Sequence, residues 1–265
     1  MGPVDYRSGL RAATSLAFSR IRQRHLRSVL GIAWFFLTPA AIFLLYWFVF
    51  GVAFKVQWRQ PDGAGGMGYV APFALGYAFF LFLSTAISGA TNALARVAGQ
   101  VRRGGVPMAV ATGSFIVEFL LHLALYLAIA LTVVTFSIGG VTAMGVGAFL
   151  GALALFVLQT LALSILLMFV TPFVDDVAEG ARLGLRLFVY AAGVTVPLQV
   201  FPDQVRAFIE FAPLSGPLNG ARDALMFSAA PSMLAWGAWA AATAVLCALA
   251  AGAYSRLRSA ALETL

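Results

Sequence analysis

The sequence predicts an all-α integral membrane protein with six transmembrane helices and both termini on the cytoplasmic side. Three observations lead to this fold class: the composition, the length of the apolar segments and the placement of the arginines. Of the 265 residues, 62% are hydrophobic and only 10% are charged, and the mean hydropathy is +0.93. A soluble domain carries about 25% charged residues. The composition therefore excludes an ordinary soluble domain.

Six apolar segments are long enough to cross a bilayer, because a transmembrane helix needs about 20 predominantly apolar residues. These segments cover residues 29–54, 70–95, 108–137, 143–172, 181–200 and 232–255. The remaining stretches are too short to fold as a separate soluble domain. We therefore expect one transmembrane domain over residues 1–265, in which 29–255 form the six-span bundle and 256–265 form a cytoplasmic tail.

The basic residues fix the orientation, because Arg and Lys collect in the short cytoplasmic loops of membrane proteins. With the N-terminus inside, only Lys55, Arg59, Arg206 and Arg222 fall on the outer side. The largest cluster, Arg20 to Arg27, stands directly before the first span. This placement accounts for the high pI through topology and contact with anionic lipid, so we expect a membrane partner and no nucleic acid.

The first 28 residues are expected to form an amphipathic helix in the cytoplasmic interface. Leu10, Ala13, Ala17 and Ile21 recur at helical spacing, and arginines occupy the neighbouring faces. Such a helix either forms a collar that orients the first span or acts as a simple anchor.

The first two spans carry many aromatic residues at helical spacing. In the first span they are Phe36, Phe43, Trp47, Phe50 and Phe54, with Tyr46 beside them, and in the second Tyr69, Phe73, Tyr77 and Phe80. Aromatic rings stack on the apolar faces of sugars, so one interpretation is a translocation path for a polysaccharide. The other is a packing surface or an interfacial aromatic belt.

Between the second and third spans, the sequence predicts a short helix over residues 92–101. Gly104 and Gly105 would close it, and Pro107 would restart the chain as the third span. Its arginines are Arg96, Arg102 and Arg103. They either present a basic surface to a cytoplasmic partner or serve only as a positively charged inner loop.

Two groups of ionisable residues each have two interpretations. Glu118 and His122 stand four residues apart within the third span, where they either lock the bundle as a hydrogen-bonded pair or relay protons. Asp175, Asp176 and Glu179 precede two arginines after the fourth span. They are expected to begin a helix and form ion pairs. The alternative is a Mg²⁺ site of a transferase that acts on lipid-linked diphosphates.

Residues 201–231 contain four prolines and two amphipathic pieces, 205–211 and 218–227. They are too polar to span and too apolar for a free loop, so we expect two short re-entrant helices that form an outer gate. Pro213 and Arg222 lie in this gate.

The sequence provides no chemistry for an enzyme. A phosphate-binding loop requires Gly-Lys-Ser or Gly-Lys-Thr, but the only lysine is Lys55, between Phe54 and Val56. Two histidines, one cysteine and no clustered metal ligands leave little for catalysis. We expect no catalytic residue, metal or cofactor in this chain.

The block from Arg27 to Gly31, followed by Trp34 and Pro39, resembles the first-span signature of permeases from polysaccharide-exporting ABC transporters. These export O-antigen, teichoic acid or capsule across the bacterial inner membrane. The resemblance implies a homodimer whose channel is formed mainly by spans one and five, with two ATPase subunits that bind ATP and Mg²⁺. The substrate would be an undecaprenyl-linked polysaccharide, and a drug or lipid permease of the same architecture is the alternative.

The resemblance also implies roles for individual residues. The segment 92–103 would be the coupling helix that docks on the ATPase, through Arg96, Arg102 and Arg103. The translocation path would be lined by Phe36, Phe43, Tyr46, Trp47, Phe50, Tyr77 and, in span five, Tyr190. The gate and interface residues would be Arg27, Trp34, Pro213 and Arg222.

Overall fold

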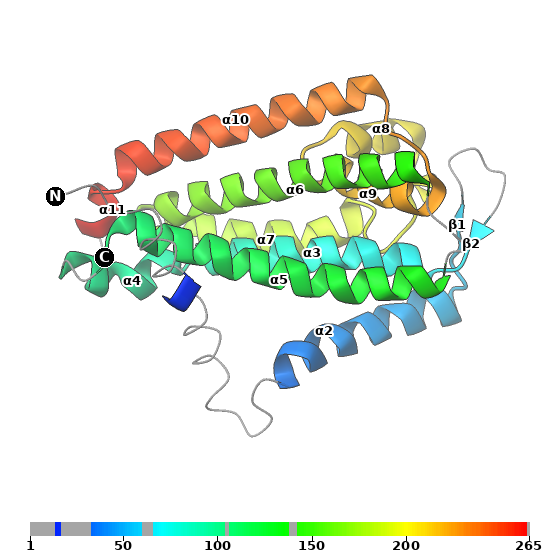
Figure 1. Cartoon of the computed structure of the whole chain (residues 1–265), viewed down its shortest axis with the longest axis horizontal. Coiled ribbons are helices and arrows are strands. Elements are labelled where there is room, and N and C mark those ends of the chain that lie inside the picture. Colours follow the sequence, from blue (N-terminus) through cyan, green and yellow to red (C-terminus); the bar gives the residue numbers. More distant parts are fainter. Residues whose placement is uncertain (1–13, 17–32, 60–65, 104–105, 138–141, 264–265) are drawn as a thin grey trace.

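The computed structural model describes residues 14–16, 33–59, 66–103, 106–137 and 142–263, and this part of the chain is almost entirely helical (Figure 1). The described elements of the first half, from residue 33 to residue 102, are α2 (Ala33–Tyr46), the π-helix η1 (Trp47–Ala53), β1 (Trp58–Arg59), β2 (Gly66–Met67), α3 (Val70–Ala90) and α4 (Ala93–Arg102). The later elements are α5 (Met108–Ser137), α6 (Ala143–Val170), α7 (Asp176–Ala191), η2 (Leu198–Val200), α8 (Asp203–Phe211), α9 (Ser215–Phe227), α10 (Met233–Leu257) and α11 (Ala260–Glu263).

Four helices are long and apolar enough to cross a membrane: α3, α5, α6 and α10, with 21, 30, 28 and 25 residues. They match the predicted second, third, fourth and sixth spans. At 1.5 Å per residue, α5 is about 45 Å long, so it extends beyond about 30 Å of hydrocarbon. These helices are apolar around most of their circumference, as expected for segments surrounded by protein and lipid.

The helices at the predicted first and fifth spans are shorter than the sequence suggests. The described residues therefore show four helices of spanning length, and the count of six spans stays a prediction. In the first, α2 continues into η1, and the apolar helical stretch covers Leu37–Ala53. In the fifth, α7 has 16 residues and begins at Asp176 rather than at residue 181. Its first turns carry charged residues, and the chain turns at Gly193, whose φ of +72° suits glycine. Charge at one end and a turn at the other limit its apolar length.

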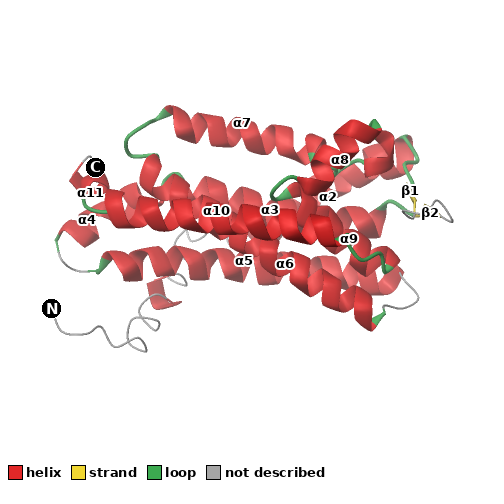
Figure 2. Cartoon of the chain, turned by 90° about the horizontal axis from the view of Figure 1, so that it is seen from above, coloured by secondary structure: helices red, strands yellow, loops and turns green. Residues whose placement is uncertain are grey.

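The α3 helix lies at the centre of the bundle, in contact with α2, α5, α6, α7 and α9. Phe79, Phe82 and Phe156 are completely buried, and the Phe79 and Phe156 rings meet edge to face with centroids 4.8 Å apart. Gly89 lets α5 approach closely, because a Cβ there would lie 2.7 Å from Phe119. In Figure 2, α7 forms one edge of this bundle.

The short elements gather at the two ends of the bundle (Figure 1). At one end α4 contacts α11, whose Ala261 is buried. Of the tail predicted over residues 256–265, Ala260–Glu263 are helical, and its cytoplasmic location stays a prediction. At the other end lie α8, α9 and the β1–β2 hairpin, and we call it the outer end after the orientation predicted from the arginines. The two outer helices confirm the short helices predicted over 205–211 and 218–227. Of the predicted N-terminal interface helix, only Thr14–Leu16 are described, and they are helical.

Candidate functional site

An aromatic cluster joins the first span to α3 and α7. We define it as Phe43, Tyr46, Phe50, Tyr69, Phe73, Tyr77, Phe80 and Tyr190. Along α3 the rings stack in series, with centroids 5.0 Å apart for Tyr69 and Phe73 and 5.3 Å apart for Phe73 and Tyr77. From α2, Phe43 stacks on Phe73 at 5.3 Å. Packed rings of this kind each contribute about 0.5–1.5 kcal/mol beyond the area they bury.

The residues of the aromatic stripe predicted on the first span do not all contact α3. Phe43, Tyr46 and Phe50 lie against α3, whereas Trp47 and Phe54 are exposed. The reason is local: the helix widens to π geometry at Trp47, which changes the angle between successive residues and rotates Phe54 out of the predicted stripe. Phe36 lies in α2, and its side chain is not among those that the structure describes.

Tyr46 connects the first and fifth spans. Its hydroxyl lies 3.3 Å from that of Tyr190 on α7, and the two rings meet edge to face. Tyr190 is 53% exposed, whereas Tyr77, also predicted to line the path, is only 4% exposed beneath α2. A half-exposed pair of phenols therefore joins α2 to α7 within a single chain.

Arg222 lies at the centre of the outer end of the bundle. Its side chain on α9 is 1% exposed, and its guanidinium carbon lies 3.9 Å from the centre of the Trp58 ring. Nη1 donates to Gly193 O at 2.8 Å, and Nη2 donates to Asn219 Oδ1. The Asp223 carboxylate is 3.6 Å from Nε. Burial lowers the pKa of Arg222 to about 10, with Asp223 opposing the shift, so Arg222 stays cationic at neutral pH.

The contacts of Arg222 unite three segments that are far apart in sequence: the β1–β2 hairpin, the turn after α7, and α9. Asn219 adds hydrogen bonds to Ala192 O and Ser215 O, both at 2.8 Å, and the Tyr69 hydroxyl donates to Thr195 O at 3.0 Å. The sequence predicted Arg222 as a gate residue but did not identify Trp58 or Asn219. The only sequence signal was the placement of Asn219 one helical turn before Arg222.

Pro213 lies at the turn between α8 and α9 and is exposed. Leu214 follows with a φ of +66°, which is unfavourable for a residue with a branched side chain. Gln159 on α6 holds this turn, because its Oε1 accepts from Leu214 N at 2.7 Å while its Nε2 donates to Trp239 O and Thr243 Oγ1. The outer helices are therefore anchored to α6 and α10 through one buried amide.

A stripe of glycines lets α9 pack against α10. A Cβ at Gly220 would lie 2.3 Å from the buried Trp239 ring. We expect Gly220→Ala to destabilise the protein by about 1–3 kcal/mol, because the ring has no room to move. Gly237→Ala on α10 is the matched control, since a Cβ there meets nothing within 4 Å. Thermal unfolding in detergent checks this, and equal melting temperatures for the two variants would contradict the packing.

The α4 helix at the opposite end confirms the short helix predicted over residues 92–101. Arg96 anchors it: Nη2 donates to Gly89 O at 2.6 Å, Nε donates to Asn92 O at 3.2 Å, and the guanidinium lies over the Phe115 ring. Arg103 is exposed at the end of the helix. Arg102 is the last residue of α4. Its side chain, like Gly104 and Gly105, lies outside the part of the chain that the structure describes.

The acidic residues after α6 begin α7 as predicted, and Glu179 forms an exposed ion pair with Arg182. Asp175, however, makes no side-chain cap hydrogen bond. In the described part of the chain, no group of three or more His, Cys, Asp or Glu side chains could hold a metal ion. Of the other predicted interface residues, Trp34 is exposed on α2, and Arg27 lies outside the described residues.

Comparison with known proteins identifies the family. The family model described as ABC-2 type transporter matches residues 13–226, which is most of the chain and covers α2 to α9. A search of curated proteins found no match. Permeases of this family pair with ATPase subunits and bind no nucleotide themselves. The chain therefore belongs to the ABC-2 type transporter family, as a multi-pass membrane permease that is not itself catalytic.

Proposed function

We propose that two copies of this chain form the membrane half of an ATP-driven exporter in the bacterial inner membrane. Its substrate would be an undecaprenyl-linked polysaccharide of the O-antigen, teichoic acid or capsule type. The observation that carries the proposal is the aromatic cluster, in which Tyr46 and Tyr190 bring spans one and five together on a half-exposed face. Rings with polar hydroxyls suit a sugar polymer, because they offer both stacking faces and hydrogen-bonding groups.

The homodimer is supported by an apolar stripe on α7. Leu183, Leu187 and Tyr190 recur at a spacing of four and three residues, so they share one face, and all three are more than half exposed. A stripe of this kind on a helix with charged first turns fits a protein partner better than lipid alone. A second copy would place two such stripes face to face across the channel.

The energy source would be a separate ATPase subunit docked on α4. The sequence has no Gly-Lys-Ser or Gly-Lys-Thr, and its only lysine is Lys55. The α4 helix is held firmly by Arg96 and ends in exposed Arg103, which suits a surface that transmits movement into α3 and α5. Trp34 and Pro213, with Arg27 and Arg222, would border the entry and exit of the path.

The test uses the permease with its ATPase subunits in lipid nanodiscs. We expect undecaprenyl-linked polysaccharide to stimulate ATP hydrolysis, and undecaprenyl phosphate without sugar to stimulate it much less. If hydrophobic drugs or phospholipids stimulate hydrolysis while the glycan has no effect, the drug or lipid permease replaces the polysaccharide exporter.

Tyr190→Ala is expected to reduce glycan-stimulated hydrolysis severalfold, because it removes a ring contact of about 0.5–1.5 kcal/mol from the path. Tyr190→Phe keeps the ring and should have a smaller effect. Leu249→Ala on α10 is the matched control, since Leu249 is equally exposed but belongs to another face of the bundle. Equal stimulation of all three variants would exclude Tyr190 from the path.

A further inference from the structure

A polar cavity lies between α2, α3 and α5 in the half of the bundle nearest α4. It encloses about 530 Å³, which is within the range of small-ligand sites. Apolar side chains such as Trp34, Ile42 and Leu81 form part of its wall, and hydroxyls such as those of Ser84, Thr85 and Tyr126 form another part. Arg96 and Glu118 also line it. A cation and a carboxylate therefore share one cavity in the membrane domain.

Glu118 is the unusual member of this lining. Its side chain is 5% exposed, and within the described structure its Oε2 atom has no hydrogen-bond partner. The sequence predicted a pair with His122, but the His122 ring nitrogen Nδ1 bonds the backbone oxygen of Glu118 at 2.7 Å. A buried carboxyl oxygen without a donor costs free energy, more so inside a membrane protein. Glu118 thus lines the cavity and has a buried carboxyl oxygen without a hydrogen-bond donor in the described structure.

Arg96 places positive charge close to this carboxyl group. Its guanidinium lies 5.1 Å from the centre of the Phe115 ring, and Phe115 precedes Glu118 by three residues on α5. Three residues correspond to about 4.5 Å along a helix. The cavity therefore presents a cation toward the cytoplasmic end and a carboxylate one turn deeper. A zwitterionic headgroup with a phosphate and an ammonium has complementary charges in this order.

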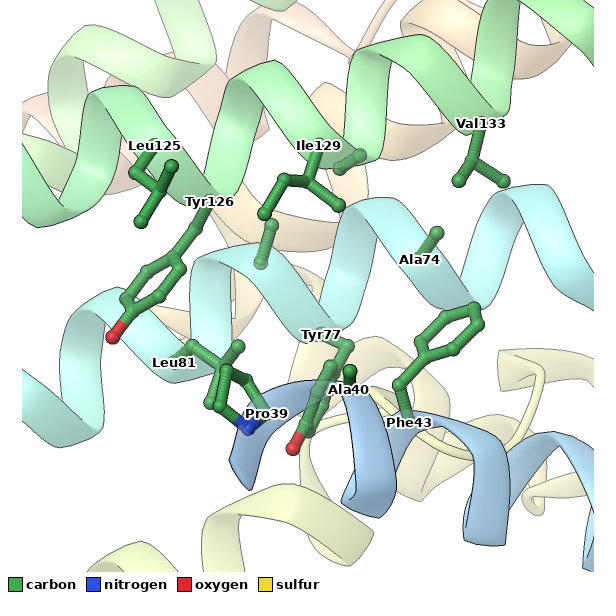
Figure 3. A pocket seen from close by; sticks show the side chains of 12 residues that line it. Pro39, Ala40, Phe43, Ala74, Tyr77, Leu81, Leu125, Tyr126, Ile129 and Val133 are labelled. Atoms are coloured by element: carbon green, nitrogen blue, oxygen red, sulfur yellow. The ribbon is translucent and has the colours of Figure 1, made fainter. Parts of the chain in front are cut away.

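A second, apolar crevice continues from the polar cavity toward the outer end of the same three helices. It is lined by Phe43, Ala74, Ile129 and Val133, among others, and encloses about 130 Å³ (Figure 3). Pro39, Leu81 and Tyr126 line both spaces, so the two adjoin. The line from the polar cavity to the apolar crevice runs along α5 from Glu118 to Val133, away from α4. This is the orientation of a lipid in the cytoplasmic leaflet, whose headgroup lies at the surface and whose chains point inward.

We propose that this cavity binds a phospholipid of the cytoplasmic leaflet whose headgroup carries a primary ammonium, such as phosphatidylethanolamine. The ammonium donates to the carboxyl group of Glu118, the phosphate pairs with Arg96, and a segment of an acyl chain occupies the crevice beside Pro39 and Ile129. The ammonium supplies N–H donors, which the carboxyl oxygens can accept. The headgroup part of this site lies apart from the Tyr46–Tyr190 pair of the export path proposed above, whereas its apolar crevice shares Phe43 and Tyr77 with the aromatic cluster. The lipid site does not depend on the identity of the cargo.

The test is lipid binding by the purified permease complex, measured by native mass spectrometry after delipidation. Phosphatidylethanolamine, phosphatidylcholine and phosphatidylglycerol of matched chain length are added separately. We expect phosphatidylethanolamine to bind about tenfold more tightly than phosphatidylglycerol, because a hydrogen bond between charged groups is gained. Phosphatidylcholine, which has no N–H, should bind more weakly than phosphatidylethanolamine. Equal retention of the three lipids would overturn the proposal.

Glu118→Gln should abolish the preference for phosphatidylethanolamine, and Glu179→Gln, an exposed residue on α7, should preserve it. A Glu118→Gln variant that keeps the preference contradicts the site. A photoreactive phosphatidylethanolamine on the unmodified protein provides a second readout if that variant does not fold. Labels on α2, α3 and α5 around the cavity support the site. Labels confined to other surfaces, or displaced only by undecaprenyl phosphate, overturn it.

Discussion

Replacing Arg222 with alanine is expected to destabilise the permease by about 3–5 kcal/mol, because it leaves buried partners without their cation. The variant loses the contact with Trp58 at 3.9 Å and the hydrogen bonds to Gly193 O and Asn219 Oδ1. The hairpin, the turn after α7 and α9 would then separate more easily. For a protein of this size the apparent melting temperature in detergent should fall by about 10 °C.

Two further variants test whether the loss of stability is specific to Arg222 or follows from any substitution at the outer end. Arg222→Lys keeps the charge but loses the planar fork that reaches two acceptors, so its stability should be intermediate. Arg206→Ala on α8 breaks an exposed pair with Asp203 and should cost about 0–1 kcal/mol. A melting temperature for Arg222→Ala as high as that of Arg206→Ala would contradict this account of the outer end.

Reversing the charge of Arg102 and Arg103 together is expected to uncouple transport from ATP hydrolysis. These residues end α4, and Arg103 is exposed. Like charges placed across a docking surface cost several kcal/mol. We therefore expect glycan export to fall at least about tenfold, while the permease folds and the ATPase subunits keep a basal activity.

The control for this variant is the double reversal of Arg256 and Arg258 to Glu, two exposed residues where α10 ends, at the same end of the bundle as α4. It carries the same change of charge without touching α4. Normal export by the doubly reversed protein, or an equal loss in the control, would rule out a specific coupling role for these two arginines. Arg96→Ala differs in kind, because Arg96 anchors α4 to Gly89 and Phe115. It should reduce stability as well as coupling.

The α3 helix contacts both ends of the bundle. Near its start, Gly76 lies beside Arg222, since a Cβ there would be 3.4 Å from Nη1. At its end, Gly89 O accepts the hydrogen bond from Arg96. The α3 helix is also the most buried of the four long helices. In the coupling role proposed for α4, α3 would therefore be the rigid element that carries movement of α4 to the outer end.

Much of the fold could be predicted from the sequence because membrane crossing depends on apolar length. The spans α3, α5, α6 and α10 follow directly from that rule, and prolines together with amphipathic spacing predict α8 and α9. The inward face of α2 could not be predicted in this way. Phe43 and Tyr46, three residues apart in regular α-helix, contact Phe73 of α3, and only the packing of the two helices shows that this side of α2 rather than the side of Trp47 is turned inward.

The candidate site residues also divide into those that the sequence could predict and those that it could not. Local signals were sufficient to predict the short helix that carries Arg96 and ends beside Arg103, whereas the coupling role of these arginines stays a prediction. The partners of Arg222 were not predictable, because Trp58 lies in a hairpin far away in the chain and only the fold brings the two together. Glu118 and His122 have the helical spacing that a side-chain pair needs. Whether the His122 ring bonds the carboxyl group of Glu118 or its backbone oxygen depends on side-chain rotamers.

The most direct test of the central proposal is affinity purification of the tagged chain from its own membranes in mild detergent. Native mass spectrometry would give the stoichiometry of the complex, and the same sample would be assayed for ATP hydrolysis. The proposal predicts two copies of this chain with two ATPase subunits, and hydrolysis that an undecaprenyl-linked polysaccharide stimulates. A chain that purifies alone and without ATPase activity would contradict it.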